Sequence, residues 1–286
     1  MANLKEIRNR IASIGSTMQI TSAMKMVSAA KLKKAQDAIT AMRPYSSKLT
    51  ELLQNLSATL DSDAGGAYSK QREVSKVLLV VVTSNRGLCG GFNSSVIKET
   101  TQNIAANYQD VDVDLLTIGK KGNDILSKSY PVIDARNDIF DNLTFDYVAE
   151  VAEKIMKLYS DGTYDKIEII YNRFKNAATQ IPQVEQFLPI KPVEGDTNAS
   201  ADYIFEPSKE KIVLELIPKS LKTQLYKAVR DSFAAEHGAR MTAMHKATDN
   251  ATELSDEILL TYNKARQAAI TNEILEIVGG AEALKN

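Results

Sequence analysis

The chain has 286 residues, of which 25% are charged, and its net charge is −1. Its single cysteine, Cys89, excludes a disulfide framework within the chain, and the balanced charge does not indicate nucleic-acid binding. No apolar run approaches the roughly 20 residues that cross a bilayer, and the amphipathic start at Leu4 is unlike a secretory signal, so we expect a bacterial protein that is not itself inserted in a membrane.

The first segment carries apolar or small residues at alternating spacings of three and four from Leu4 to Leu56. A heptad pattern sustained over this length predicts one long helix of a coiled coil across residues 1–60. Pro44 should bend or locally break this helix, because proline lacks the N–H group and clashes with the preceding turn.

Three consecutive positions on this predicted seam are polar, namely Thr21, Lys25 and Ser28. Two interpretations are open. In one, a register drift moves the seam onto a neighbouring stripe. That stripe consists of Ile20, Met24 and Val27. In the other, the polar positions mark a contact with a partner.

The middle of the chain alternates between two kinds of pattern. A polar, glycine-containing linker at residues 61–72 precedes a continuous apolar run at residues 77–83, which is typical of a strand buried on both faces of a sheet. Further strands are expected at residues 113–118, 132–133, 166–171 and 183–188, and helices at residues 93–108, 121–127 and 144–159. This alternation predicts a small doubly wound, Rossmann-like α/β domain over residues 73–190, followed by a loop-like stretch up to residue 207.

Residues 208–286 read as a second coiled-coil helix, on the order of 100 Å long. Its expected seam consists of Met244, Ala247, Ala251, Leu254, Ile258, Ala265, Ala268 and Leu275. The fold class is therefore α/β, with a small doubly wound domain inserted between two long helices that pair in antiparallel fashion.

The length of the two helices predicts how they pair. If residues 57 and 209 lie level, paired residue numbers add to about 266, which places Leu4 beside Tyr262 and residues 21–28 opposite residues 238–245. The helix beyond Arg266 then has no partner within the chain.

Catalytic and cofactor motifs are weak in this sequence. The turn at residues 87–91 follows a strand and precedes a helix, but it matches neither a dinucleotide fingerprint nor a P-loop. Cys89 is expected to be a small buried residue of this turn, and His237 and His245 are expected to be ordinary packing or solvated histidines. We therefore expect no catalytic residue, cofactor or metal.

The last twenty residues or so are apolar on more than one face, which would favour aggregation unless another protein encloses them. Polar side chains precede this tip at spacings that face outward on successive turns: Arg266, Gln267, Thr271 and Glu273. This layout predicts that the tip lies inside a sleeve formed by a partner.

Four motifs resemble the gamma subunit family of F-type ATP synthases. They are ITSAMKMVSAAKLKKAQ from Ile20, SNRGLCGGFN from Ser84, RMTAMHKATDNA from Arg240, and the Ile270, Thr271, Glu273, Glu276 and Gly280-Ala281 pattern near the end. The likeness runs along the whole chain, and the absence of an extra segment in the α/β domain is similar to the plain bacterial form rather than the photosynthetic one.

The resemblance implies a non-catalytic rotating central stalk, present in one copy per complex at the cytoplasmic face of the membrane. The implied partners are the alpha and beta subunits of the catalytic hexamer, the epsilon subunit and the c-ring, with no nucleic acid. It also implies contacts with the surrounding subunits at Met24, Lys25, Arg240, Arg266, Gln267, Thr271 and Glu273.

Two other functions remain as alternatives at this point. One is a nucleotide-dependent enzyme of the doubly wound type with a helical dimerisation hairpin, and the other is a purely structural coiled-coil tether.

Overall fold

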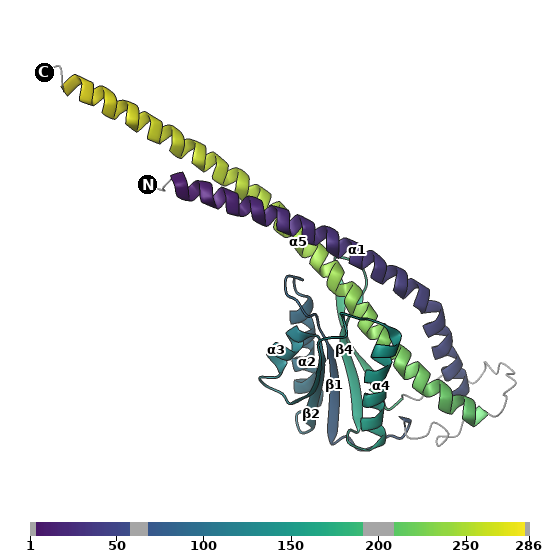
Figure 1. The fold of residues 1–286 in the computed structure, drawn as a ribbon. Helices are drawn as coiled ribbons and strands as arrows, with labels where there is room; N and C mark the ends of the chain where they lie inside the picture. Colours follow the sequence, from purple (N-terminus) through teal and green to yellow (C-terminus); the bar gives the residue numbers. More distant parts are fainter. Residues whose placement is uncertain (1–3, 58–67, 191–208, 284–286) are drawn as a thin grey trace. The chain divides into compact units, whose positions relative to one another are not determined.

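The computed structural model describes residues 4–57, 68–190 and 209–283 (Figure 1). The chain divides into two compact units. One combines Met1–Ser28 with Met241–Asn286, and the other is Ala29–Arg240. Helices α1 (Leu4–Ser57) and α5 (Lys209–Ala283) each contribute to both units.

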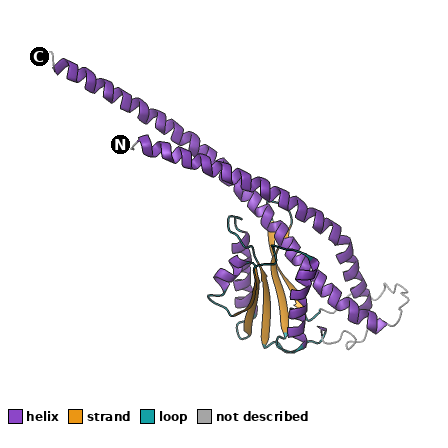
Figure 2. Cartoon of the chain, viewed as in Figure 1, coloured by secondary structure: helices purple, strands orange, loops and turns teal. Residues whose placement is uncertain are grey.

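The larger unit is built on one five-stranded sheet, drawn as the orange arrows of Figure 2. The strands are β1 (Lys76–Val82), β2 (Asp112–Ile118), β3 (Val132–Arg136), β4 (Lys166–Phe174) and β5 (Gln180–Leu188), in the order β3-β2-β1-β4-β5. The first four are parallel, and β5 pairs with β4 in antiparallel fashion.

Strand β1 explains why the sheet needs helices on both faces. Its residues from Val77 to Val82 are all 0% exposed, because alternate side chains enter two separate apolar clusters. Such a strand is stable only when both faces of the sheet are covered.

Helices α2 (Phe92–Asn107) and α3 (Lys120–Leu126) cover one face. Helix α4 (Phe145–Ser160) and the part of α5 between Ile217 and Val229 cover the other (Figure 1). The prediction of a doubly wound α/β domain inserted between two long helices is therefore confirmed.

The ends of the elements differ from the predicted ones by at most three residues, and the two ends where β4 and β5 join each extend by three. Their antiparallel register continues to the pair Phe174 and Gln180, so both strands are longer than expected. The outer residues of this hairpin are polar or half-buried, and a search for apolar runs does not detect them. Residues 61–67 of the expected linker and most of the expected loop lie outside the described residues.

Helix α1 runs through Pro44 without interruption, so of the two outcomes expected at this proline, a bend or a local break, the break does not occur. Ile39 and Leu49 on either side of the proline are both 5% exposed, and their packing holds the helix across the missing hydrogen bond.

The smaller unit combines residues 4–28 of α1 with residues 241–283 of α5. Three contacts set its register: Arg8 with Tyr262 at 2.9 Å, Thr21 with Thr248 at 2.8 Å, and Lys25 with His245 at 3.3 Å. The paired numbers, 8 with 262, 21 with 248 and 25 with 245, add to 269 or 270. The expected register, with Leu4 beside Tyr262, was wrong by about one helical turn, because a four-residue shift keeps the same face inward and the apolar pattern cannot distinguish the two.

The polar residues of α1 do occupy the seam. Thr21 is 8% exposed and Ser28 is 2% exposed, whereas Ile20 and Val27 of the neighbouring stripe are 60% and 57% exposed. The register-drift interpretation is therefore wrong.

The seam of α5 also departs from the expected one at several positions. Leu254, Ala268 and Leu275 are exposed, and the half-buried positions at these levels are Ser255, Tyr262 and Ala269.

Candidate functional site

The natural ligand site of a doubly wound sheet lies at the carboxyl ends of its strands, where the strand order reverses. In this sheet that point lies between β1 and β4. Cys89 and Phe92, which follow β1, pack there against Ala235 and Ala239 of α5, with Phe174 alongside. The chain's own side chains fill the crevice in which a nucleotide would bind.

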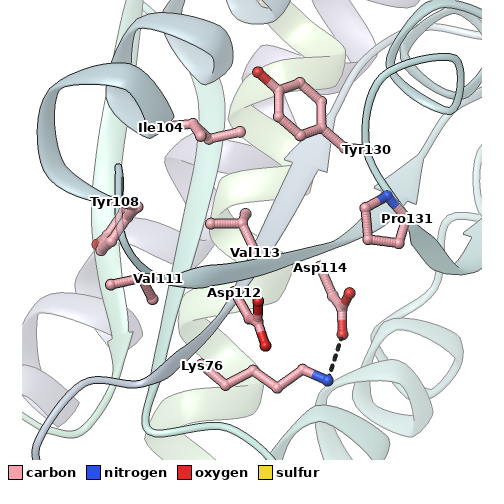
Figure 3. Close-up of a pocket in the computed structure, with 9 residues that line it drawn as sticks. All are labelled: Lys76, Ile104, Tyr108, Val111, Asp112, Val113, Asp114, Tyr130 and Pro131. Carbon is pink, nitrogen blue, oxygen red and sulfur yellow. Dashed lines mark ion pairs between the residues drawn. The ribbon is translucent and has the colours of Figure 1, made fainter.

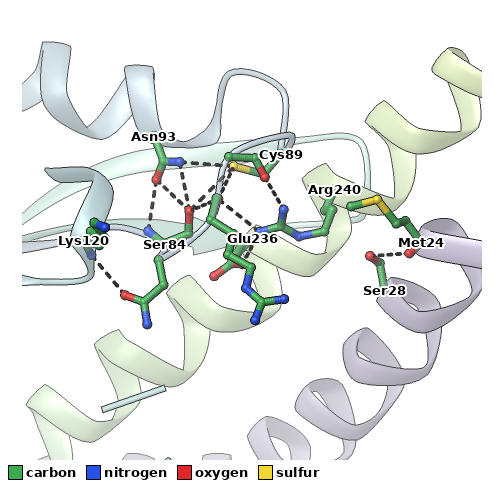
Figure 4. A network of polar contacts seen from close by, with 11 residues as sticks. Met24, Ser28, Ser84, Cys89, Asn93, Lys120, Glu236 and Arg240 are labelled. Carbon is green, nitrogen blue, oxygen red and sulfur yellow. Dashed lines mark hydrogen bonds and ion pairs between the residues drawn. The ribbon is translucent and has the colours of Figure 1, made fainter. Parts of the chain in front are cut away.

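The turn after β1 is held by a buried polar network (Figure 4). Ser84 N–H and Ser84 Oγ donate to Asn93 Oδ1 at 3.0 and 3.1 Å, and Asn93 Nδ2 donates to the Cys89 sulfur at 3.2 Å. Cys89 is 2% exposed, and this burial raises the pKa of its thiol. The expectation that Cys89 is a small buried residue is confirmed.

Arg240 of α5 closes the same turn from the helix side. Its guanidinium donates to the carbonyl oxygens of Gly87 and Arg86 and pairs with Glu236, one helical turn earlier (Figure 4). Both members of the pair are nearly buried, and burial raises the pKa of Glu236 although the adjacent Arg240 opposes the rise. Leu88, which directly follows these two carbonyls, has a φ of 62°, a conformation that Leu rarely adopts, so the clamp holds the backbone next to a strained residue.

His237 is a packing histidine, as expected, but a fully buried one. It is 5% exposed, and its ring meets the edge of Phe233 at a centroid distance of 4.5 Å. Neither ring nitrogen has a hydrogen-bond partner among the described residues.

Met24 and Lys25, two of the predicted contact residues, lie on the paired part of α1. Both are half-buried. The Met24 carbonyl accepts a hydrogen bond from Ser28 Oγ at 2.7 Å (Figure 4), and Lys25 Nζ lies 3.3 Å from His245 Nδ1 across the seam. His245 Nδ1 in turn lies 3.4 Å from Asp249 Oδ2.

The other predicted contact residues lie on the distal part of α5. Arg266, Gln267, Thr271 and Glu273 are all exposed. Beyond them, large apolar side chains are 47–71% exposed: Ile270, Ile274, Leu275, Ile277 and Val278. Every residue of α5 from Ile270 to Glu282 is exposed within the described part of the chain.

One pocket of about 420 Å³ opens at the opposite, amino-terminal edge of the sheet (Figure 3). It lies beside Tyr108 and Tyr130, and Lys76 Nζ in its floor pairs with Asp114 Oδ2 at 3.1 Å. This ion pair already satisfies two of the charged groups, and no set of polar atoms converges on the space.

Two further observations bear on the class of protein. Within the described ranges, no helix is both long and apolar enough to cross a membrane, and no group of three or more metal-ligating side chains occurs. A filled ligand crevice, a helical hairpin with a polar seam and an apolar exposed helix end together define a class of α/β protein that acts through contacts with partners.

Comparison with known proteins identifies the family. A sequence model of the ATP synthase family matches residues 3–284. The ATP synthase gamma chain of Flavobacterium psychrophilum is 73% identical over 286 residues, with 100% of both chains covered, and that of Christiangramia forsetii is 63% identical over 284 residues, with 99% of both covered. The chain belongs to the ATP synthase gamma chain family, whose members form the non-catalytic central stalk of the rotary complex.

Solved structures agree with this assignment. The central stalk and c-ring structure of the Tetrahymena thermophila mitochondrial ATP synthase contains a chain that is 28% identical, with a TM-score of 0.62, and the match covers 80% of this chain and 99% of that one. A chain of the Euglena gracilis mitochondrial ATP synthase shares the fold, with a TM-score of 0.71 at 22% identity over 98% of this chain and 94% of that one.

Several residues of the site were not predicted from the sequence. Glu236 precedes Arg240 by four residues, a spacing that indicates a helical ion pair and could have been noticed. Asp249 follows His245 by four residues and carries the same signal, whereas Thr248 carried none, because its role depends on the register of the hairpin.

Proposed function

We propose that this chain transmits rotation of a c-ring to a hexamer of alpha and beta subunits through contacts that differ from one side of the shaft to the other. The observation that carries the proposal is the exposed apolar end of α5, where Ile274 and Ile277 are 54% and 71% exposed. A contiguous exposed apolar surface of this kind marks a site of interaction with another protein and otherwise favours aggregation. A single helix is also asymmetric, so each of its orientations would favour a different state in each surrounding subunit.

The contact residues in this proposal form two groups. Met24 and Lys25 would meet the catalytic subunits beside the paired helices, and Arg266, Gln267, Thr271 and Glu273 would bond to loops around the tip. The exposure of the four α5 residues and the half-buried positions of Met24 and Lys25 support this proposal. Arg240 is 7% exposed, so it would act through the backbone of residues 86–88 that it holds.

The remaining partners in the proposal are an epsilon subunit and the c-ring, with one copy of this chain per hexamer at the cytoplasmic face of the membrane. The Tetrahymena thermophila structure, which joins a central stalk with a c-ring, supports the second of these.

The test is co-purification followed by turnover measurements. The chain should elute with an alternating hexamer at one copy per hexamer, and Lys25→Glu and Glu273→Lys should each change ATPase turnover of the reconstituted complex. Glu253→Lys is a matched control, because Glu253 is an exposed acidic residue of α5 outside both groups. Wild-type turnover in both test variants would contradict the assigned contacts, and elution without a hexamer would favour a tether.

A nucleotide-dependent enzyme is the rival function, and the filled crevice at the β1 turn argues against it. Tight binding of ATP or NAD by the isolated chain in equilibrium dialysis would reverse this judgement.

A further inference from the structure

One ring nitrogen in the hairpin lies close to two groups of opposite charge. His245 Nδ1 is 3.3 Å from the Lys25 ammonium nitrogen on α1 and 3.4 Å from the Asp249 carboxylate oxygen on α5. An imidazole nitrogen carries either a lone pair or a proton, so it can accept from the ammonium or donate to the carboxylate, but it cannot do both. The two contacts are therefore alternatives.

We propose that His245 is a positioning residue whose protonation state decides whether Lys25 is held on the hairpin or released from it. When the ring is neutral with its lone pair on Nδ1, Lys25 donates to it and the ammonium is fixed across the seam. When the ring is protonated, Nδ1–H donates to Asp249, and the imidazolium repels Lys25.

The surroundings of the ring leave this exchange free to occur. The side chains of His245 and Asp249 are 57% and 58% exposed, so the ring can exchange protons with water. The charged groups that face it are Lys25 from α1 and Asp249 from α5, and the next residue, Lys246, is an exposed cation. The neighbouring seam layer consists of Thr21 and Thr248, which are uncharged and bond to each other.

The consequence for function rests on the contact that we proposed for Lys25. Histidine is the side chain that ordinarily changes charge between pH 5 and 8. Across this range the released fraction of Lys25 would rise as pH falls, so the strength of the contact between shaft and catalytic subunits would depend on pH. Exposed pairs of this kind are weak, so the expected change in turnover is about twofold.

The first experiment needs no partner. The chain contains two histidines, and burial lowers the pKa of His237 to about 4, so in full-length protein labelled with nitrogen-15 histidine the His237 resonances should stay constant between pH 5.5 and 8, and those of His245 can be followed separately. In the neutral form Nδ1 should give the resonance of an unprotonated nitrogen. Lys25→Ala should raise the titration midpoint of His245, and Asp249→Asn should lower it, each by a few tenths of a pH unit.

Two outcomes of this titration would overturn the proposal. One is a neutral His245 with its proton on Nδ1. The other is a midpoint that does not change in Lys25→Ala, with Lys25→Met as a second variant that keeps the apolar stem of the side chain. Neither result bears on whether Lys25 contacts the catalytic subunits.

The second experiment uses the reconstituted complex. The ratio of turnover at pH 6 to that at pH 8 should differ about twofold between wild type and His245→Asn, whose amide can accept from Lys25 at every pH. Superimposable pH profiles would show that His245 does not control the position of Lys25 in the complex. Lys25→Glu, measured at one fixed pH, separately tests the contact between Lys25 and the catalytic subunits. Failure of the His245 proposal and failure of the proposed function therefore give different results.

Discussion

Thr21 of α1 and Thr248 of α5 share a hydrogen bond of 2.8 Å between their hydroxyl groups in the seam between the two helices. Each hydroxyl also lies within bonding distance of a carbonyl of its own helix, Met18 at 3.1 Å and Met244 at 2.8 Å. A polar pair of this kind fixes the register of a coiled coil, because a slip by one turn would bury each hydroxyl without its partner.

Removing half of this pair should cost more than removing all of it. We expect Thr21→Val to lower the free energy of unfolding by about 1 kcal/mol, and Thr21→Val with Thr248→Val to recover part of the loss, because no hydroxyl is then left without its cross-helix partner. Urea unfolding of the full chain measures both. Additive losses would show that the two hydroxyls act independently.

The buried ion pair between Arg240 and Glu236 should show a larger effect of the same kind. Arg240→Met leaves the Glu236 carboxylate buried without its cation and should lower the free energy of unfolding by about 3–5 kcal/mol. Adding Glu236→Gln should restore a large part of this loss. The comparison of single and double variants by chemical denaturation provides the test, and a loss below about 1 kcal/mol in Arg240→Met would show that water reaches the pair.

His237 gives the larger unit a pH-dependent stability. Burial lowers the pKa of His237 to about 4, below the ordinary histidine value of 6.5. Between these two pH values the unfolded chain therefore binds a proton that the folded ring excludes. Stability should therefore fall as pH decreases from about 6.5 to 4, by up to about 3 kcal/mol from this residue. His237→Leu should remove this part of the slope, which a series of unfolding curves between pH 7 and 4.5 can measure. An unchanged slope would mean that the ring is protonated inside the fold.

Two helical glycines differ in what surrounds them and should respond differently to alanine. A Cβ atom on Gly15 of α1 would meet nothing within 4 Å, so Gly15→Ala should stabilise the chain by about 0.5–1 kcal/mol. A Cβ atom on Gly238 of α5 would lie 3.1 Å from the Ala177 Cα and 3.3 Å from the Phe174 ring. Crowding should cancel the helix-propensity gain in Gly238→Ala, and Gly238→Val should destabilise by about 1–3 kcal/mol. Thermal unfolding distinguishes these cases, and equal gains in both alanine variants would contradict the crowding.

The exposed tip should matter only in the complex. Ile274→Ala with Ile277→Ala should leave the free energy of unfolding of the isolated chain within about 0.5 kcal/mol of wild type, because both side chains are already exposed. The same variant should lower ATPase turnover of the reconstituted complex, with Leu259→Ala, which is 48% exposed further down α5, as a matched control. A large loss of stability in the isolated chain would show that the tip packs within this protein.

The sequence was sufficient to predict the fold class, because each element carries a strong local signal. Strand β1 is continuously apolar, and the heptads of α1 extend over several turns, so their existence did not depend on tertiary detail. The ends of β4 and β5 depend on cross-strand pairing between half-buried residues, which leaves no run of apolar side chains to detect.

The candidate site was harder to predict because its details depend on register. The apolar pattern is unchanged by a shift of one turn, so it could not show that Thr21 meets Thr248 or that Lys25 meets His245. The exposure of the distal residues of α5 was easier to predict, because it does not depend on which residue of α1 lies beside them. Arg240 illustrates the opposite case, since its clamp on the residue 86–88 backbone requires a tertiary contact between segments that lie about 150 residues apart.

The filled crevice between β1 and β4 has a mechanical consequence. Because Ala235 and Ala239 of α5 occupy it, and residues of the same helix from Ile217 to Val229 are buried on the sheet, this stretch of helix has no room to slide or roll against the domain. A twisting force applied to the sheet would therefore reach the helix with little elastic loss. The space in which related folds bind a small molecule here serves as the joint that makes a helix and a sheet turn as one body.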